Sequence, residues 1–262
     1  MYKDKVVWIT GASAGIGAGL ADAFARRGAR VILSARNQAG LEQVHARLPE
    51  RERHRVLPLD LEAQDTFAAA VARVIEDEGG VDLLVHNAGL SQRSMIADTH
   101  PDVYRRLMEI NYFGTIALTM AVLPHMVERG SGRFAVISSL AGKFATPLRS
   151  GYAASKHALH GWFEALRLEH EKDGIAVTMV CPGFIDTDIS VNALTGDGSP
   201  QQSRDDAQQN GLSVDVFCRR MLAGLEKNRH EVIVAGRLGV TVWLKRLFPG
   251  LLHRILLRAR VT

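Results

Sequence analysis

VVWITGASAGIG, residues 6–17, places an apolar run directly before three clustered glycines. This pattern predicts a strand that turns sharply into a helix. Gly11 would give the turn a positive φ, Gly15 would let a ligand approach the backbone, and Gly17 would let the helix pack close to the strand. The free N–H groups and the positive dipole end of that helix favour an anion. We therefore expect a dinucleotide pyrophosphate at this corner.

Further along the chain, apolar runs alternate with helical patterns. Strands are expected at 6–10, 30–35, 55–61, 81–86, 134–138, 175–181 and 232–234, and helices at 17–27, 38–48, 63–78 and 151–171. Buried strands separated by helices cannot close as hairpins, so the sheet should be parallel with helices on both faces. The chain is predicted to be a doubly wound α/β protein with one domain, residues 1–236, and a helical C-terminal extension, residues 237–262.

Composition narrows the class of protein. The chain has 262 residues, 47% of them hydrophobic, and its two cysteines, Cys181 and Cys218, show no disulfide or zinc spacing. We expect a reducing, cytoplasmic setting, with no signal peptide and no apolar stretch long enough to span a membrane. None of the ten histidines shows H-x-E or H-E-x-x-H spacing, so no metal is expected.

The net charge of +4 belongs to the C-terminal extension. Residues 237–262 contain six Lys or Arg and no acid, which leaves 26 basic and 28 acidic residues elsewhere, a net charge of −2. The body of the protein therefore has no basic excess, and we expect no binding to nucleic acid.

Polar and small residues follow the predicted strands. In chain order these are the glycine turn, then Arg36, Asp60, 87–89, 138–139 and 182–187. In an open parallel sheet the ligand binds at the carboxyl ends of the strands, so these residues should surround it.

A second motif, Tyr152-Ala-Ala-Ser-Lys156, opens a long predicted helix. Its Tyr and Lys are four residues apart and project from the same helical face. A neighbouring ammonium favours phenolate, so the pair forms a tunable acid/base. A lone Y-x-x-x-K is more often a surface pair, but Ser139 follows a predicted strand and belongs to the same sheet edge.

Together these motifs resemble the short-chain dehydrogenase/reductase family, in the branch of roughly 250 residues. TGASAGIG (10–17), HNAG (86–89), Asn111, ISS (137–139), YAASK (152–156) and PGFIDT (182–187) have the order and spacing of that family over about residues 5–235. The resemblance implies a Rossmann-type fold and hydride transfer between a nicotinamide cofactor and a carbonyl or secondary alcohol. One departure is His86, which stands where the family usually has Asn.

The resemblance also implies residue roles. Tyr152 would be the catalytic acid/base, Ser139 would orient the substrate oxygen, Lys156 would hold the nicotinamide ribose and lower the Tyr152 pKa, and Asn111 would support a water relay. The expected cofactor contacts are Gly11, Ser13, Gly15, Ile16, Gly17, Arg36, Asp60, Leu61, Asn87, Ala88, Gly89, Tyr152, Lys156, Pro182, Gly183, Ile185 and Thr187.

The end of the second strand favours NADP(H) over NAD(H). Ala35 occupies the place where a carboxylate usually meets a free ribose hydroxyl. Arg36 follows it, and its guanidinium suits a 2′-phosphate to which Ser13 could also donate. The alternative is a solvated arginine at a strand end.

The substrate is a small carbonyl or alcohol that the sequence does not specify. Residues 188–212 are polar and contain Gly, Ser and Pro, so they should form a mobile lid or be disordered. The resemblance suggests a homodimer or homotetramer, with Ala158, Leu159, Trp162 and Leu166 on the contact face. Alternatives are an idle dinucleotide-binding scaffold and a lipid or acyl-chain carbonyl reductase at a membrane surface.

Residues 237–262 are predicted to form two amphipathic helices divided at Pro249-Gly250. Their apolar face could be buried by the substrate cleft, a second subunit or an anionic bilayer. The cleft is the favoured choice, which would make the pocket apolar and select a lipophilic carbonyl. Contact with a membrane surface is the least favoured of the three.

Overall fold

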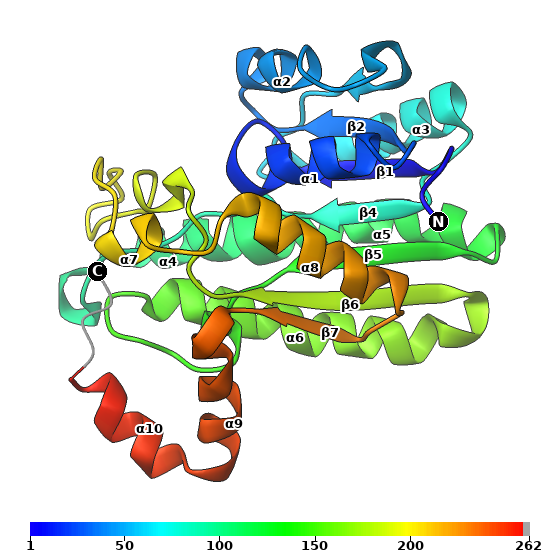
Figure 1. Cartoon of the computed structure of the whole chain (residues 1–262). Coiled ribbons are helices and arrows are strands. Elements are labelled where there is room, and N and C mark those ends of the chain that lie inside the picture. The colour runs from blue at the N-terminus through cyan, green and yellow to red at the C-terminus, as the bar shows by residue number, and fades with distance from the viewer. Residues whose placement is uncertain (259–262) are drawn as a thin grey trace.

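The computed structural model describes residues 1–258, so Arg260 of the predicted extension lies outside the described residues. Its centre is a seven-stranded parallel sheet in the order β3-β2-β1-β4-β5-β6-β7 (Figure 1). The strands are β1 (Val6–Thr10), β2 (Arg30–Ser34), β3 (Arg55–Val56), β4 (Leu83–His86), β5 (Gly132–Ile137), β6 (Ile175–Pro182) and β7 (Glu231–Val234). The predicted single doubly wound α/β domain is confirmed.

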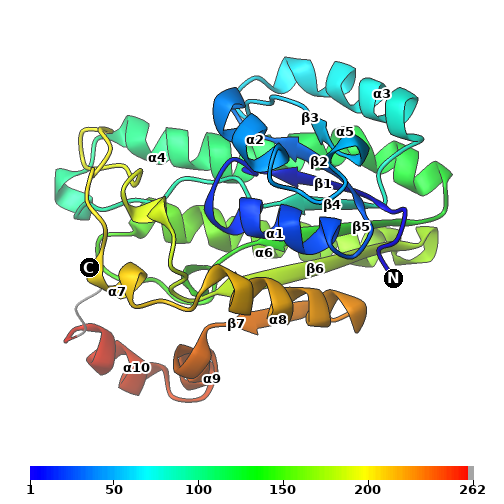
Figure 2. The same ribbon diagram turned by 45° about the horizontal axis from the view of Figure 1, so that its top comes forward.

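Helices cover both faces of the sheet. They are α1 (Gly15–Ala25), α2 (Gln38–His45), α3 (Phe67–Glu78), α4 (Pro101–Met108), α5 (Gly114–Glu128), α6 (Ser150–His170), α7 (Asp206–Gln209), α8 (Val214–Glu226), α9 (Val240–Leu247) and α10 (Pro249–Leu256). Figures 1 and 2 show α1 and α8 on one face and α3, α5 and α6 on the other.

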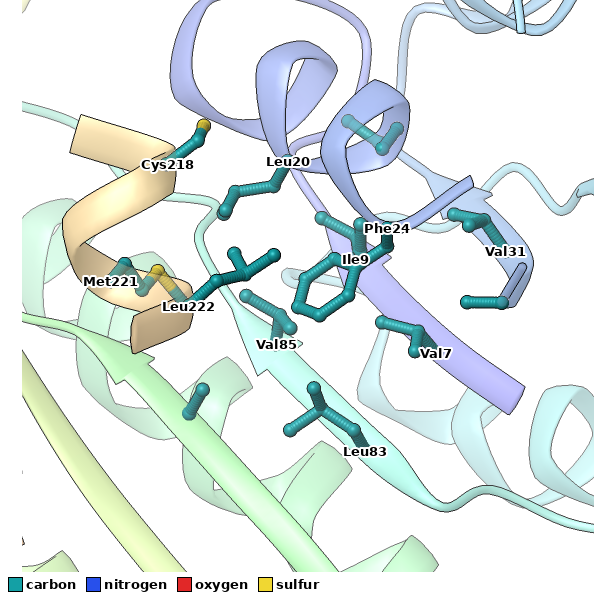
Figure 3. Close-up of a cluster of buried hydrophobic side chains, with 14 of the residues drawn as sticks. Val7, Ile9, Leu20, Phe24, Val31, Leu83, Val85, Cys218, Met221 and Leu222 are labelled. Atoms are coloured by element: carbon teal, nitrogen blue, oxygen red, sulfur yellow. The ribbon is translucent and has the colours of Figure 1, made fainter. Parts of the chain in front are cut away.

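Alternate residues of β1 supply the two cores. Val7 and Ile9 pack with Leu20 and Phe24 of α1 and with Leu222 of α8 (Figure 3). The neighbouring positions point to the opposite face, since successive side chains of a strand alternate.

On that second face, Trp8 packs in a cluster with Val122 of α5 and Phe163 of α6. All three side chains are fully buried. The sheet is therefore apolar on both faces, which fixes the register of β1 and with it the position of the glycine turn that follows.

The third strand is shorter than predicted. Residues 55–61 read as one apolar run, but β3 contains only Arg55 and Val56. Beyond Val56 the N–H groups of Leu57 and Leu59 still donate to the Leu33 and Ala35 carbonyl oxygens. Pro58, which has no N–H to donate, lies between them on the open side of this edge strand, whose single neighbour is β2. The other predicted elements exist, with ends shifted by a few residues.

The expectation that no stretch is apolar enough to span a membrane is wrong by composition. Pro101–Glu128 contains a window apolar enough, by length and composition, to span a membrane, although no such stretch was expected. In the fold this stretch comprises α4, the π-helical turn Glu109–Phe113 and α5, and its residues Leu118, Val122 and Met126 are fully buried against the sheet. One side of this stretch therefore belongs to the core, and 44% of its apolar window is buried.

Residues 188–212, which were expected to form a mobile lid or be disordered, take a defined path in the structure. They begin with the turn Asp188–Ser190, contain α7 and make bridges from Leu194 to Gln92 and Pro200. The extension forms α9 and α10 as expected, but the helices separate at Phe248, and Pro249 is the first residue of α10. A proline is well suited to that position because its missing N–H would have no helical partner there.

Candidate active site

The glycine turn has the conformation that the sequence predicts. Gly11 has a φ of +66°, and a Cβ on Gly17 would lie 2.1 Å from the Gly11 carbonyl oxygen. Asn87 Nδ2 holds the turn from the side, donating to the carbonyl oxygens of Thr10 and Gly11 at 3.1 and 3.0 Å. The close approach of α1 to β1 therefore depends on a residue without a side chain at position 17.

A groove with a volume of about 890 Å³ lies along the carboxyl ends of β1, β2 and β4. The N-terminus of α1 has no side-chain cap and no acidic residue in its first turn, which leaves its N–H groups free for an anion. The predicted cofactor residues that line this groove are Gly11, Ser13, Gly15, Ile16, Arg36, Asp60, Leu61, Asn87, Ala88, Gly89 and Thr187. Gly17 lies behind them, in the packing of the helix. The groove therefore suits a dinucleotide.

Charged residues gather at the β2 end of the groove. Arg36 Nη1 lies 3.4 Å from Glu62 Oε2, and both side chains are partly exposed. Arg106 approaches the same carboxylate at 3.7 Å. Glu62 was not among the predicted site residues. It pairs with the Arg36 guanidinium, which is predicted to bind the 2′-phosphate.

A second cavity, of about 280 Å³, holds the predicted reacting groups. Ser139, Tyr152 and Lys156 line it, together with Pro182, Gly183 and Ile185. It meets the groove at four predicted cofactor residues, which line both: Ile16, Asn87, Gly89 and Thr187. A cofactor lying in the groove could thus present one end to the tyrosine.

Burial dominates the electrostatics of the acid/base pair. It raises the Tyr152 pKa, while a hydrogen bond with Ser139 and the charges of Arg149 and Arg93 oppose that rise. Burial also lowers the Lys156 pKa to about 8. Lys156 was expected to lower the Tyr152 pKa, and the net shift of that pKa in this structure is upward. The Lys156 ammonium donates to the Ile137 carbonyl oxygen at 2.8 Å and lies 5.8 Å from the centre of the tyrosine ring.

Asn111 lies outside both cavities, in the π-helical turn. Its amide oxygen accepts from the Leu90 N–H at 2.8 Å, and its amide nitrogen donates to the Leu90 carbonyl oxygen at 2.9 Å and to Ser155 Oγ at 3.0 Å. A Cβ on Gly89 would lie 3.0 Å from the amide oxygen and 3.5 Å from Lys156 Nζ. Asn111 therefore joins the Leu90 backbone to α6 directly behind the lysine.

Gln92, which the sequence analysis missed, holds the start of α6. Its amide oxygen accepts from the backbone N–H groups of Gly151 and Tyr152 at 2.7 and 3.3 Å, and its side chain is fully buried. Side-chain acceptors at a helix N-terminus satisfy N–H groups that have no partner within the helix. Gln92 is thus a positioning residue for the tyrosine.

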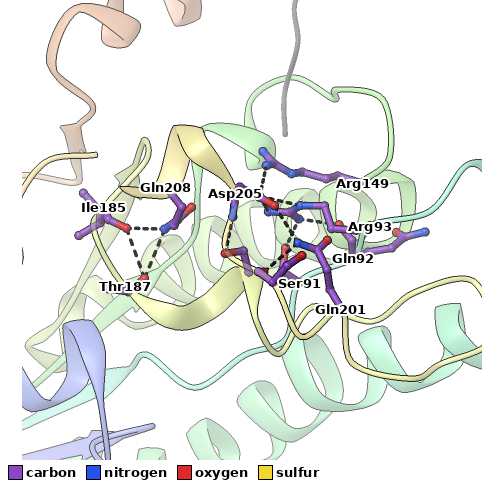
Figure 4. A network of polar contacts seen from close by, with 11 residues as sticks. Ser91, Gln92, Arg93, Arg149, Ile185, Thr187, Gln201, Asp205 and Gln208 are labelled. Carbon is purple, nitrogen blue, oxygen red and sulfur yellow. Dashed lines mark hydrogen bonds and ion pairs between the residues drawn. The ribbon is translucent and has the colours of Figure 1, made fainter. Parts of the chain in front are cut away.

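A buried ion cluster ties residues 188–212 to the cavity (Figure 4). Asp205 Oδ2 accepts from Arg93 Nε at 2.8 Å and from Arg149 Nη2 at 3.4 Å, and Gln201 donates to the other carboxylate oxygen at 2.9 Å. Although burial alone would raise it, the Asp205 pKa lies below its usual range because Arg93 and Gln201 donate to the carboxylate. Arg93 and Arg149 also line the cavity.

Gln208 of α7 makes a second attachment, at the predicted cofactor contact Thr187. Its amide donates to the Ile185 carbonyl oxygen and, at 3.3 Å, to Thr187 Oγ1 (Figure 4). The segment 188–212 is therefore attached at two points, through Gln208 to Thr187 and through Asp205 to Arg93 and Arg149. No local pattern marks these residues, because their partners lie far away in the sequence.

Two histidines have inward positions. His86, the departure from the family pattern, stacks on Phe134 and pairs its Nε2 with Thr119 Oγ1 at 2.7 Å, away from the cavities. His160 Nε2 lies 2.9 Å from Ser138 Oγ. Burial lowers the pKa of each to about 3. Among residues 1–258, no group of three His, Cys, Asp or Glu side chains could hold a metal ion.

The predicted subunit-contact face requires a correction. Leu159 and Leu166 are 1% and 4% exposed and pack in the core beneath α6, so they cannot contact a second subunit. Their helical spacing correctly marked an apolar stripe, but that stripe faces the sheet.

Comparison with known proteins agrees with this geometry. The family described as short chain dehydrogenase matches residues 5–197. Dehydrogenase/reductase SDR family member 7B from Bos taurus is 41% identical, covering 97% of this chain and 81% of the relative. A short chain dehydrogenase from Burkholderia cenocepacia, solved in complex with NADP, is 27% identical with a TM-score of 0.81, covering 98% of this chain and 100% of the other.

The fold alone does not choose the cofactor. A short chain dehydrogenase/reductase from Burkholderia phymatum was solved in complex with NAD. It superimposes with a TM-score of 0.83 at 20% identity, over 95% of each chain.

Proposed function

Because the chain belongs to the short-chain dehydrogenase/reductase family, whose members are NAD(P)-dependent oxidoreductases, we propose that it uses NADP(H) to interconvert a lipophilic carbonyl compound and its secondary alcohol. The observation that carries the proposal is the junction of the two cavities. The anion-binding groove opens at Asn87 and Thr187 into a cavity that contains Ser139 and Tyr152.

The chain's own residues would handle the proton. A tyrosine hydroxyl is protonated at neutral pH, and burial of Tyr152 raises its pKa further, so this hydroxyl can donate to an oxygen that gains negative charge. Ser139 lines the same cavity and would donate a second hydrogen bond to that oxygen. The bound nicotinamide would supply or accept the hydride.

The lysine would act on the cofactor side. Lys156 lines the cavity close to Gly89, a residue that the cavity shares with the groove. With a pKa of about 8, the Lys156 side chain is mainly in its ammonium form at neutral pH. We assign it to the ribose hydroxyls, with its backbone contact to Ile137 holding it in place.

The preference for NADP(H) rests on the β2 end of the groove. Ala35, Arg36 and Ser13 all line it, and no carboxylate occupies position 35. Arg36 and Arg106 share the single carboxylate of Glu62, so this cluster of three side chains carries one net positive charge. A 2′-phosphate would compensate that charge.

The preference for a lipophilic substrate rests on the walls of the reacting cavity. Leu140, Phe144 and Phe184 line it, and the extension adds Leu252 and Leu256. Contact with an apolar wall stabilises a bound substrate where the substrate surface that it buries is also apolar. The predicted position of the extension beside the cleft therefore supports a carbonyl compound with an apolar body.

The test is a panel of apolar and small polar ketones and aldehydes, each assayed with NADPH and with NADH by cofactor absorbance. We expect turnover of apolar members with NADPH, and a raised KM for these members alone in Leu252→Ala. The proposal fails if small polar carbonyls are preferred, or if NADH supports equal kcat/KM.

A further inference from the structure

The two helices of the extension present apolar side chains to solvent. Trp243, Leu247, Phe248 and Leu251 are 62%, 63%, 60% and 50% exposed. We call the tail surface the six exposed apolar residues from the start of α9 to the last turn of α10: Val240, Trp243, Leu247, Phe248, Leu251 and Ile255. Exposed apolar residues gathered on adjacent helices mark an interaction surface.

The opposite side of these helices is anchored to the domain. Leu252 is 1% exposed and packs with Leu140, Phe144 and Ala235, while Leu244 and Leu256 are partly buried against the same cluster. The helices therefore have a fixed position, and Figures 1 and 2 both show them projecting beyond β7 at the side of the molecule. The cleft buries only one side of the amphipathic extension.

The tail surface adjoins the reacting cavity. Ile255 is 46% exposed and also lines that cavity, as does Leu238, which is 42% exposed. A molecule in contact with the tail surface would thus lie at the rim of the space that contains Tyr152.

The charged side chains of the extension have one sign. Residues 237–262 contain no Asp or Glu, and the described basic residues of the extension, Arg237, Lys245, Arg246, Arg254 and Arg258, are all exposed. On α10, Arg254 is three residues beyond Leu251 and so flanks the apolar stripe, and Arg258 follows in the turn after the helix. The described part of the extension combines an apolar face with a basic border.

We propose that the tail surface docks on the surface of an anionic lipid bilayer, with its helices lying in the interface. A helix with an apolar face and a basic polar side is the form that binds such interfaces. Each Lys or Arg near the surface gains free energy from anionic headgroups, and the apolar residues gain it from the acyl boundary.

A second copy of the chain fits this surface less well. A twofold interface places the same patch of both copies together, so the basic borders would face each other with no acid of the extension to pair with. An anionic bilayer has the complementary charge.

Docking would let a lipophilic carbonyl pass from the bilayer into the reacting cavity past Leu238 and Ile255. This transfer of substrate is the one step that rests on the proposed function. The docking itself depends only on the extension. Its test is therefore done without substrate or cofactor, so that failure of the docking and failure of the proposed function are distinguishable.

The experiment measures co-sedimentation with phosphatidylcholine vesicles, with and without phosphatidylserine. We expect binding only to the phosphatidylserine vesicles, weakened by salt. Leu247→Glu with Leu251→Glu should weaken it at least about tenfold, because two exposed apolar contacts are lost. Lys245→Gln with Arg246→Gln should also weaken it about tenfold or more. Leu168→Glu, at a leucine of α6 that is 73% exposed, is the matched control and should bind like the wild type.

Trp243 gives an independent signal, since Trp8 is fully buried and Trp162 is half-buried. Its fluorescence should shift to shorter wavelength with phosphatidylserine vesicles, and Trp243→Phe should remove the shift. The proposal is overturned if the wild type stays in the supernatant, or if the two-leucine variant binds vesicles like the wild type. It is also overturned if that variant converts an oligomer to a monomer in light scattering while the wild type binds no vesicles.

Discussion

Replacing Asp205 tests whether the buried ion cluster holds the lid segment over the cavity. The side chains of Arg93, Asp205 and Arg149 are 6%, 2% and 10% exposed. Asp205→Asn keeps the size of the side chain but removes the charge that both guanidiniums share. Removing one partner of a buried ion pair costs about 3–5 kcal/mol, so we expect a loss of that size in the free energy of unfolding.

The matched control is Asp186→Asn. Asp186 also pairs with an arginine of the lid segment, Arg204, but the two side chains are 49% and 35% exposed. Exposed pairs contribute about 0–1 kcal/mol, so this variant should unfold almost like the wild type.

The assays are urea unfolding and steady-state kinetics on the best ketone of the panel. For Asp205→Asn we expect kcat/KM to fall about tenfold to a hundredfold, because Arg93 and Arg149 of the cavity wall lose the carboxylate that holds them. Equal losses of stability in the Asp205 and Asp186 variants would refute the account of the cluster.

Three further predictions concern single groups. Burial holds the His86 pKa at about 3, against an ordinary value of about 6.5, so the unfolded state alone gains a proton as the pH falls below that value. The free energy of unfolding that the neutral His86 contributes above about pH 6.5 is thus lost on acidification, by about 2 kcal/mol at about pH 5. His86→Asn should remove this loss, as measured by urea unfolding at both pH values. Ala35→Asp with Arg36→Ile should reverse an expected tenfold or greater preference for NADPH, measured as Kd for both cofactors, because the new carboxylate repels a 2′-phosphate; equal affinities in the wild type would count against Arg36. Ser139→Ala should lower kcat by about 10²–10³, the usual effect of losing one donor to a developing oxyanion, and an unchanged kcat would remove Ser139 from that role.

The sheet and the glycine turn were predictable because their signals are local. Apolar runs mark buried strands wherever both faces are covered, and the G-x-x-x-G-x-G spacing marks the helix that follows β1. Tyr152 and Lys156 share a face of α6 by their spacing alone. Pro58 shows the limit of this reasoning, since the apolar run around it continued where the strand did not.

The supports of the site were not predictable, because they join residues distant in the sequence. Arg93 and Asp205 are separated by 112 positions, and Gln92 caps a helix 59 positions away. The spacing of residues along the sequence does not indicate which of these distant side chains will pair. The extension was only partly predictable for the same reason. Its amphipathic pattern was clear, but which of its residues pack against Phe144 depends on the tertiary fold.

The central claim is that Tyr152 moves the proton in an NADP(H)-dependent carbonyl reaction. Tyr152→Phe removes one hydroxyl from the cavity and little packing, so the most direct measurement is its NADPH-linked turnover of an apolar ketone alongside its NADPH affinity. We expect turnover to fall by at least about 10², the scale of lost acid/base catalysis, while the Kd for NADPH stays close to that of the wild type. A variant that keeps near wild-type kcat on that ketone would contradict the account.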